Sequence, residues 1–443
     1  MRSSPLTSRL RFKSARDAEA HLLSFVNYER IIDYRPTSRT HDLRAFEARL
    51  RTAGWRPGAV PTVHVGGTNG KGTVAHLIER VLRAGGVRTG LYTSPHLQDM
   101  RERIRVDGLP IGARVFCRGV ERLAGVFAAR SGTGFRTTFE HLTALALLEF
   151  QERRVDRAIL EVGLGGKLDA TNVIPAGPVV LTPVSLDHQH VLGDTVKAIA
   201  ADKARIVKPG GRVFLLEQPP EAEAAIRARA RRVGVEVTPV ASAVRVDPVA
   251  GKRDGVFRIR GKREYGVVRT RLLGLHQRSN VAAAVAVAEA LLPAARCRAA
   301  VGRGLTGAVV SGRLQRLRWR GLRVVLDGGH NPGAARAVAE ALERAYAGAR
   351  IVAVVGMASD KNHREYLDEL RPRVREFVFT RAQNPRAAPP GVLRAALGEG
   401  TTAPSVRAAL DRAAQTTPDV LLVSGSFLIV GEALSVMRRR ARR

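Results

Sequence analysis

A glycine-rich segment around a single lysine, "VHVGGTNGKGTVAHLIERVL" (residues 63–82), carries the clearest chemical signal in this sequence. It follows an apolar β-branched run and leads into an amphipathic helical pattern. Glycines let backbone N–H groups approach phosphate oxygens, the start of a helix adds positive dipole, and Lys71 adds a mobile charge. A usual P-loop would have glycine at Val65 and Ser or Thr directly after Lys71, whereas Gly72 intervenes before Thr73. We therefore predict a variant phosphate-binding loop; the alternative is a plain turn that joins strand to helix.

Polar side chains that follow other apolar runs predict a metal near this loop. Glu161 ends the run "AILEV", where an unpaired carboxylate would be costly, so it needs a cation or a hydrogen-bond donor. Magnesium sites in nucleotide enzymes use one or two carboxylates with phosphate oxygens and water. His188 follows another strand at the edge where parallel sheets place ligand crevices, and Ser94 in "LYTSPHL" offers a hydroxyl. A salt bridge for Glu161, a structural role for His188 and a Ser-Pro turn remain the alternatives.

Further polar positions stand beside predicted helices. Lys203 lies fifteen residues after His188 on a helical pattern, where most lysines face solvent. In "VVLDGGHNPGAA", Asp327 and His330 occupy a polar turn between a strand and a helix, which repeats the organisation of the glycine-rich segment. Asn280 stands at the start of an alanine-rich helix, where helix capping is the alternative role.

The elements that carry these residues predict an α/β protein. Apolar β-branched runs alternate with helical patterns along most of the chain, which is typical of parallel sheets covered by helices on both faces. The segment 256–274 breaks this alternation and predicts a small β-rich excursion. We predict an N-terminal P-loop-type domain with a mostly parallel sheet over residues 1–308, which includes this excursion, and a smaller C-terminal Rossmann-like α/β domain over residues 309–443.

Composition narrows the function classes. The net charge of +33 would suit a nucleic-acid binder, but the excess is mostly arginine spread along helices, and only 5% of the residues are aromatic. We therefore expect attraction for anionic substrates and no nucleic-acid partner. No apolar stretch approaches transmembrane length and the first residues are charged, so we expect no membrane partner and a cytoplasmic location. Cys117 and Cys297 are far apart and lack Cys or His neighbours at ligand spacing, which argues against a zinc site.

Taken together, these segments resemble the folylpolyglutamate synthase and dihydrofolate synthase family, a branch of the Mur ligases. The likeness runs from about "NYERIIDYR" to "SGSFLIVGEAL" and so covers nearly the whole chain. Peptidoglycan Mur ligases typically have threonine where Gly72 stands. The motifs that carry the resemblance are, in order, "GTNGKGT", "TSPHL", "TTFE", "EVGLGGKLDATN", "DHQHVLG", "DKARIVKPG", "GLHQRSN", "SGRL" and "DGGHNP".

The resemblance implies ATP and Mg²⁺ as cofactors and assigns roles to individual positions. The ATP-binding residues would be Gly67, Thr68, Asn69, Gly70, Lys71, Gly72, Thr73, Asn280, Arg313 and Asp327. The magnesium ligands would be Ser94, Glu161 and His188, and the catalytic residues would be Lys71, His330 and Lys203, the last matching a lysine that becomes carbamylated. The pterin-facing residues would be Thr137, Thr138, Phe139, Glu140, Leu168, Asp169 and Ala170.

The implied pterin site leads to a specific expectation for Asp169. Asp169 follows the glycine turn after Glu161, so we expect it in the crevice rather than in the core, where its carboxylate can hydrogen-bond the amino-pyrimidine edge of a pterin while Phe139 packs on the ring. Two features depart from the family pattern. Gly329 replaces the alanine of "DGAHNP", and "YRPTSRTHDLRAFEARL" does not reproduce the "DLGLERV" loop that helps to hold dihydropteroate in some bifunctional members.

The implied chemistry is amide formation by carboxylate activation. The γ-phosphoryl group of ATP moves to a folate or pteroate carboxylate, the amine of L-glutamate attacks the acyl phosphate, and phosphate leaves. This reaction needs positioning and charge neutralisation rather than a protein nucleophile. We expect a monomer that binds only small molecules. The alternatives are another Mur-type amide ligase that acts on a different acid, and a basic nucleic-acid-binding ATPase, whose binding would weaken steeply with salt.

Overall fold

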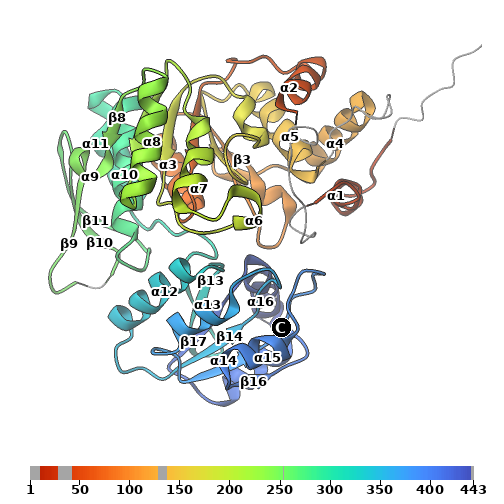
Figure 1. Ribbon diagram of the computed structural model, residues 1–443, viewed down its shortest axis with the longest axis vertical. Helices are drawn as coiled ribbons and strands as arrows, with labels where there is room; N and C mark the ends of the chain where they lie inside the picture. Colours follow the sequence, from red (N-terminus) through yellow and green to blue (C-terminus); the bar gives the residue numbers. More distant parts are fainter. Residues whose placement is uncertain (1–9, 28–41, 128–136, 253, 441–443) are drawn as a thin grey trace, which may run out of the picture.

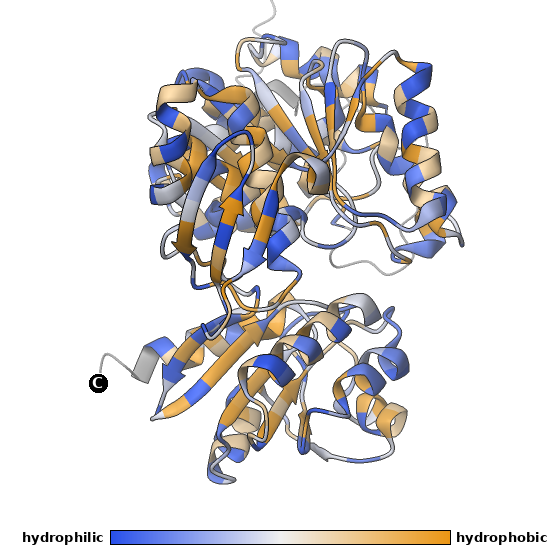
Figure 2. Cartoon of the chain, turned by 90° about the vertical axis from the view of Figure 1, so that its left-hand side faces the viewer, coloured by the Kyte–Doolittle hydropathy of each residue, from blue (hydrophilic) through white to orange (hydrophobic). Residues whose placement is uncertain are grey.

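The computed structural model describes residues 10–27, 42–127, 137–252 and 254–440, and the statements below refer to these ranges. The chain forms two stacked α/β parts, each built on its own sheet (Figure 1). Hydrophobic residues concentrate in the strands of both sheets (Figure 2). No helix in the described ranges has the length and apolar character needed to cross a bilayer.

The first part contains an eight-stranded sheet with the order β4-β3-β2-β5-β1-β6-β7-β8. The six strands from β2 to β8 in this order run parallel, whereas β3 is antiparallel to both β2 and β4. Because β1 lies at the centre, its carboxyl end is flanked by those of β5 and β6. The strands are β1 (Thr62–Gly66), β2 (Thr89–Tyr92), β3 (Ile104–Val106), β4 (Leu109–Pro110), β5 (Arg157–Glu161), β6 (Pro178–Leu181), β7 (Arg212–Leu215) and β8 (Val237–Pro239).

Helices cover both faces of this sheet. Alternation along β5 sends Ile159 into a core shared with α3, α10 and α11, and sends Ala158 and Leu160 into a second core with α1, α4 and α5. The helices of this part are α1 (Ala15–Leu23), α2 (Leu43–Thr52), α3 (Lys71–Ala84), α4 (Ala113–Phe127), α5 (Thr138–Glu152), α6 (Gln189–Leu192), α7 (Val196–Lys203), α8 (Pro220–Arg232), α9 (Val240–Ala243), α10 (Gln277–Leu291) and α11 (Ala294–Leu305). Three short 3₁₀ turns are η1 (Met100–Arg103), η2 (Ala170–Val173) and η3 (Ala204–Ile206).

The predicted β-rich excursion is a three-stranded antiparallel sheet of β9 (Arg245–Pro248), β10 (Val256–Arg260) and β11 (Glu264–Arg269). It lies at one side of the first part and shares a core with α10 and α11 (Figure 1). The sequence pattern marked β10 and β11 but not β9, which precedes the predicted segment.

The second part contains a six-stranded sheet with the order β12-β13-β17-β14-β15-β16, parallel except for β12. The predicted fold class is thus confirmed. The predicted division at residue 308 falls between α11 and β12 and stays a proposal. The elements are β12 (Gln315–Trp319), β13 (Leu322–Asp327), α12 (Pro332–Ala345), β14 (Ile351–Val355), α13 (His363–Leu370), β15 (Glu376–Phe379), α14 (Pro390–Leu397), β16 (Thr401–Thr402), α15 (Val406–Gln415), β17 (Val420–Ser424) and α16 (Phe427–Arg440).

A buried histidine in the central strand predicts acid sensitivity. His64 contacts the Thr171 hydroxyl through Nε2 at 2.8 Å, and that hydroxyl donates to Asp169. Burial, with a smaller contribution from Lys208, lowers the pKa of His64 to about 3. The unfolded chain takes up a proton near pH 6.5, whereas the folded chain does not until about pH 3, so stability falls as the pH drops through this window.

We expect this one group to remove about 2 kcal/mol of unfolding free energy between pH 7 and pH 5. Urea unfolding of the His64→Gln variant, which keeps a hydrogen-bond donor, should accordingly show a weaker loss over the same interval. The exposed His190→Gln is the control. An unchanged pH dependence in His64→Gln would show that another group causes the acid sensitivity.

Candidate active site

The predicted phosphate loop connects the central strand β1 to α3. Gly67 has φ = 128°, and a Cβ there would lie 2.1 Å from the Thr182 hydroxyl, so only glycine fits. The N–H groups of Thr68 and Asn69 donate to the Pro183 carbonyl at 3.0 and 3.2 Å. No side chain caps α3, so the first N–H groups of this 14-residue helix are open to an anion.

Lys71 stands at the end of this loop, and the carboxylate of Glu161 stands at the end of the neighbouring strand β5. Lys71 Nζ donates to the Thr68 carbonyl at 3.1 Å, and burial lowers its pKa although Glu161 and Asp187 act in the opposite direction. Glu161 is 2% exposed and accepts a hydrogen bond from the Ser94 backbone N–H at 3.0 Å. Burial raises the pKa of Glu161, opposed by Lys71 and Arg313. The expected cation and donor for this carboxylate are therefore both present.

The predicted magnesium ligands are of the residue types that bind a divalent cation, but their side chains do not form a ready-made metal site. The structure brings the carboxylate of Glu161 and the Ser94 backbone together, while His188 caps the start of α6 with a left-handed backbone, φ = 52°. Burial lowers the pKa of His188 to about 3, so its imidazole is neutral, as a metal ligand must be. Within the described ranges, no three His, Cys, Asp or Glu side chains gather as a metal site. Phosphate oxygens and water would have to complete the coordination of Mg²⁺.

Lys203 does not face solvent. It is the last residue of α7 and is 5% exposed, because the glycine turn after β5 packs on it: a Cβ on Gly166 would lie 2.8 Å from the Lys203 Cα. Burial and, to a smaller degree, Lys71 lower the pKa of Lys203 to about 7. A substantial fraction of this side chain is therefore a neutral amine near neutral pH.

The second part contributes Asp327 and Arg313. Asp327 accepts hydrogen bonds from the N–H groups of Leu314 and Gly329 at 2.9 and 2.8 Å and so fixes the turn after β13. The Arg313 guanidinium stacks on the Phe427 ring at 4.3 Å. A Cβ at position 72 would lie 3.2 Å from Arg313 Nη2 and 3.3 Å from both Glu161 carboxylate oxygens, so Arg313 reaches the phosphate loop from the second part.

A polar junction joins the two parts on the other side of the loop. Asp187 forms a 2.8 Å ion pair with Lys361 and lies 3.8 Å from His330 Nε2. Asn331 Nδ2 donates to Asn69 Oδ1 at 3.1 Å and to Asp187 Oδ2 at 3.3 Å. Burial alone would raise the pKa of Asp187, but the facing His188, Lys361 and His330 hold it well below its ordinary value. The turn that carries His330 thus contacts the phosphate loop through Asn331, and the catalytic role of His330 stays a prediction.

Sequence reasoning missed Lys361. The signal was available, since "IVAVVGMASDKNH" places this lysine shortly after a buried strand, at the sheet edge where the other candidates lie. Its partner was not readable from the sequence, because Asp187 is 174 residues away and belongs to the other sheet.

The Asp187–Lys361 pair makes a prediction about the junction. The two side chains are 12% and 11% exposed, and removal of one partner of a buried pair leaves an uncompensated charge. We expect Lys361→Met to separate the two parts, seen as a larger radius of gyration in X-ray scattering, and to slow ligation about tenfold or more. The double variant Asp187→Asn, Lys361→Met should recover compactness without activity. A Lys361→Met protein as compact as wild type would contradict the role of this pair.

Asn280 lies inside α10 rather than at its start. The helix begins at Gln277, and Asn280 donates to the Gln277 side chain at 2.9 Å. Its Oδ1 lies 2.9 Å from where a Cβ on Gly70 would stand, so it contacts the phosphate loop. The helix-capping alternative is therefore wrong, and the predicted nucleotide contact stays a prediction.

The predicted pterin-facing residues already have local partners. Thr137 and Glu140 form the capping box of α5, and the Thr138 hydroxyl donates to the Leu22 carbonyl at 2.8 Å. Phe139 is 5% exposed, and a Cβ on Gly163 would meet its ring at 2.5 Å.

Asp169 is buried, which corrects the expectation that it lies in the crevice rather than in the core. Its carboxylate accepts from the N–H groups of Gly163, Leu164 and Thr171 at 2.9–3.0 Å and from the Thr171 hydroxyl. It holds the glycine turn, and Leu168 and Ala170 flank it. A hydrogen bond to a pterin would have to be added to these contacts or replace one.

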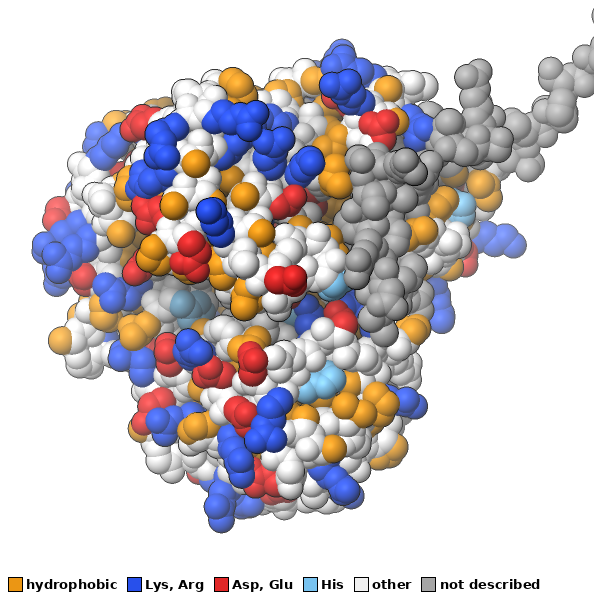
Figure 3. Space-filling view, viewed as in Figure 1, with side chains coloured by type: hydrophobic (Ala, Val, Ile, Leu, Met, Phe, Trp, Pro, Cys, Tyr) orange, Lys and Arg blue, Asp and Glu red, His pale blue; other side chains and the backbone are white. Residues whose placement is uncertain are grey.

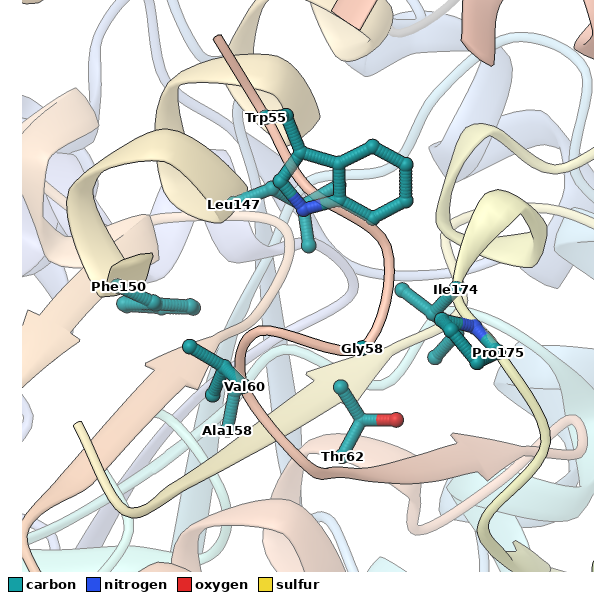
Figure 4. A pocket seen from close by; sticks show the side chains of 9 residues that line it. All are labelled: Trp55, Gly58, Val60, Thr62, Leu147, Phe150, Ala158, Ile174 and Pro175. Carbon is teal, nitrogen blue, oxygen red and sulfur yellow. The ribbon is translucent and has the colours of Figure 1, made fainter. Parts of the chain in front are cut away.

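The described residues form hollows at both ends of the strands of the first sheet. An open cavity, about 830 Å³ with open solvent included, extends from Gly72, Ser94 and Glu161 along α3. Its lining combines arginines, carboxylates, histidines and apolar side chains; among them are Arg80, Arg83, Arg105, Arg313, Glu79, Glu102, His76, His96, Leu97, Val309, Val310 and Phe427. A smaller one lies at the amino ends of β1 and β5 (Figure 4). Its lining is apolar apart from Thr62 and the indole nitrogen of Trp55. It lies at the opposite end of the strands from the phosphate loop, so it is not part of the candidate site.

Comparisons with known proteins identify the family. The sequence matches the Mur ligase middle domain over residues 65–288 and the Mur ligase, glutamate ligase domain over residues 312–427. It is 32% identical to the dihydrofolate synthase/folylpolyglutamate synthase of Mycobacterium tuberculosis over 94% of this chain and 95% of that protein. The chain belongs to the folylpolyglutamate synthase/dihydrofolate synthase family of Mur ligases. The family resemblance inferred from the motifs is thus confirmed.

Solved structures agree with this family. The fold matches a Mycobacterium tuberculosis folylpolyglutamate synthase complexed with ADP, with a TM-score of 0.83, 30% identity and coverage of 96% of this chain and 98% of that one. It also matches a bifunctional family member with Mn, AMPPNP and L-glutamate bound, with a TM-score of 0.81, 28% identity and coverage of 97% and 100%. A Halobacterium salinarum relative, named a probable bifunctional folylpolyglutamate synthase/dihydropteroate synthase, is 36% identical over 84% of this chain, which spans only 46% of that relative's length.

Proposed function

We propose that this family member is an ATP-dependent ligase that joins L-glutamate to a folate or pteroate carboxylate through an acyl phosphate. One observation carries the proposal: the phosphate loop with Lys71, the carboxylate of Glu161 and the guanidinium of Arg313 converge at the junction of the two parts. Such convergence of cations and a metal-type carboxylate is what phosphoryl transfer to a carboxylate requires.

Each group has a defined task in this scheme. The N–H groups at the start of α3 and Lys71 hold the ATP phosphates, and Arg313 approaches them from the second part. Mg²⁺, when bound by Glu161, Ser94 and His188, supplies charge neutralisation on the phosphate oxygens. Asn280 and Asp327 border the nucleotide. His330, whose Nε2 lies 3.8 Å from Asp187 Oδ2, is assigned to the catalytic step.

The arginine-lined cavity supports an anionic acceptor. It opens on Glu161 and Ser94, so a carboxylate at its inner end would meet the γ-phosphate of ATP. Its apolar wall of Leu97 and Phe427 suits the aromatic body of a folate. Arg83 is paired with Glu79, so the other guanidinium groups of the lining are the ones that suit substrate carboxylates. The match to a structure with AMPPNP and L-glutamate bound supports ATP and L-glutamate as the other two substrates.

The decisive experiment measures ADP release from ATP and Mg²⁺ with tetrahydrofolate or dihydropteroate, each with and without L-glutamate. Release that requires both an acceptor and glutamate supports the proposal. Release with a muramyl acceptor instead would identify another Mur-type ligase, and release stimulated by nucleic acid would favour the basic ATPase. Binding of nucleic acid would then weaken steeply with salt.

Dihydropteroate is a second candidate acceptor, supported by the bifunctional names of several relatives. The Phe139 ring, which the family resemblance assigns to the pterin, stands against Gly163, two residues after Glu161. Of the segment compared with the "DLGLERV" loop, residues 34–41 lie outside the described residues, and residues 42–50 form the N-cap and most of α2. Formation of dihydrofolate from dihydropteroate, ATP and glutamate tests this activity. Extension of tetrahydrofolate alone would leave only the folylpolyglutamate synthase function.

The remaining predictions concern binding partners, oligomeric state and cellular location. On the face in Figure 3, lysine and arginine side chains are interspersed with acidic ones and form no continuous stripe, which supports small-molecule substrates over nucleic acid. The monomeric state, the absence of a nucleic-acid partner and the cytoplasmic location stay predictions.

A further inference from the structure

One helix of the second part reaches into the segment that carries Ser94. This segment, residues 93–99, is here called the Ser94 loop. Leu97 in this loop packs against the core that α15 and α16 form with the second sheet. A Cβ on Gly312 would lie 3.0 Å from the Leu97 side chain and 3.5 Å from Val430. The loop therefore belongs to the first part by sequence but is held by the second.

The backbone of α16 touches the backbone of this loop at Gly431. A Cβ at position 431 would lie 1.9 Å from the Leu97 carbonyl oxygen and 2.8 Å from its carbonyl carbon. These are backbone atoms and cannot rotate away, so any side chain at position 431 must push the loop and the helix apart. Only glycine permits this contact.

Two polar bonds continue the contact along α16. Gln98 Nε2 donates to the Ser435 hydroxyl at 2.7 Å, and Arg438 Nη1 donates to Gln98 Oε1 at 2.5 Å. Both amide atoms of Gln98 are thus used across the junction. Positions 431, 435 and 438 are one helical turn apart and lie on the same face of α16.

The contact is mechanically close to the predicted metal site. Glu102 accepts the N–H groups of Leu97 and Gln98 at 3.0 and 3.3 Å, so these two residues move as a unit. Ser94 is three residues away, and its N–H binds the Glu161 carboxylate at 3.0 Å. A displacement at Leu97 therefore passes through a short segment to the group that orients Glu161.

We propose that α16 sets the position of the Ser94 loop, with Gly431, Ser435 and Arg438 as positioning residues for the Glu161–Ser94 site. The two parts of the chain then assemble the site together: docking of α16 orders a loop of the first sheet domain. This inference rests on the proposed function for its catalytic consequence, but the positioning itself is a property of the folded chain.

Gly431→Ala is the sharpest test, because the substitution should stabilise the helix α16 but disrupt its contact with the Ser94 loop. In a helix, alanine is favoured over glycine, so α16 itself should gain stability. The loop should nevertheless lose its contact. We expect faster hydrogen–deuterium exchange at the amides of residues 94–98, and an Mn²⁺ affinity in the presence of ADP, measured by electron paramagnetic resonance, that is weaker by about 10- to 100-fold. The kcat for ligation should fall by a similar factor, with little change in KM for ATP.

A matched control is Gly391→Ala, because Gly391 lies in the helix α14 of the same part and a Cβ there meets nothing within 4 Å. It should leave exchange, Mn²⁺ affinity and kcat at wild-type values. Arg438→Ala should give a smaller shift in the same direction as Gly431→Ala, and the exposed Arg407→Ala on α15 should give none.

The outcomes separate the two proposals. Wild-type exchange in residues 94–98 and wild-type Mn²⁺ affinity in Gly431→Ala would overturn the positioning role, whatever its activity. A wild-type protein without glutamate-dependent ADP release would overturn the proposed function, whereas faster loop exchange in Gly431→Ala would still support positioning by α16. If Gly431→Ala unfolds, exchange and Mn²⁺ affinity in Arg438→Ala decide in the same way.

Discussion

Replacement of Lys71 with alanine should lower kcat by about 10²- to 10³-fold, the scale expected when one preorganised charge at a reacting phosphate is lost. Lys71 is partly buried at the start of α3, and its ammonium donates only to the Thr68 carbonyl among the described residues. Lys71 forms no direct ion pair among the described residues, and Arg313 remains as a second cation near Glu161 when Lys71 is replaced. With ATP bound, the Lys71 charge faces the phosphates, where the water-excluded surroundings strengthen its effect.

Folding should survive this change. Because burial lowers the pKa of Lys71, the native state already bears a desolvation cost for this cation, and its removal should cost less than about 1 kcal/mol of unfolding free energy. Steady-state ADP release and urea unfolding measure the two quantities, with the exposed Lys197→Ala as control. Near-normal turnover in Lys71→Ala would remove this residue from the site, and loss of folding would make its role structural.

The sequence was informative wherever the signal is local. A strand, a glycine turn with Lys71 and a helix follow one another within residues 62–84, and the structure has this order. Glu161 and Asp327 end their strands, so the parallel arrangement alone brings them to sheet edges that carry sites. The β9 strand and the short hairpin of β3 and β4 were missed because they are short edge elements with weak alternation.

Two short motifs also signalled local structure, but they were interpreted only as parts of the pterin site. "TTFE" has the Thr-x-x-Glu form of a capping box, and Thr137 and Glu140 form one. "DAT" has the form of an Asp-led turn, and Asp169 caps η2 through the Thr171 N–H. Both readings rest on bonds within four residues and were available without a structure.

Contacts between the two parts could not be predicted. The pairing of Asp187 with Lys361 and the approach of Gly431 to Leu97 depend on how two separately folded sheets dock. No periodicity or motif spacing encodes that arrangement. The burial of Lys203 was unpredictable for a related reason, although it arises within the first part. A helix lysine faces solvent unless a turn distant in sequence, here at Gly166, covers it.

Lys203→Ala should lose most of the ligase activity, and short carboxylates should restore part of it. An ammonium at this place would repel a neighbouring Mg²⁺, whereas a carbamate is an anion able to bind the metal or orient its waters. The neutral amine attacks CO₂, a nitrogen–carbon bond forms, and one proton is released. Burial lowers the pKa of Lys203 to about 7, so at fixed dissolved CO₂ the carbamate fraction should rise as the pH increases through this value.

Lys208 offers a matched control for this experiment. Burial lowers its pKa to about 8, but its ammonium donates to the Asn172 carbonyl at 2.6 Å and to the Ile174 carbonyl. Lys208→Ala should therefore lose stability, and acetate should not rescue its activity. Lys203 forms no such bonds within the described ranges, so its alanine variant should keep its fold and respond to acetate.

Carbon-13 NMR with labelled CO₂ reads the modification directly. A carbamate resonance should appear in wild type and in Lys208→Ala, and should be missing from Lys203→Ala. Its intensity should follow activity as the pH is raised from 6 to 8, since both depend on deprotonation of the same buried amine. An active protein without this resonance at saturating CO₂ would show that Lys203 works as a simple amine or cation, and acetate rescue would then have to fail as well.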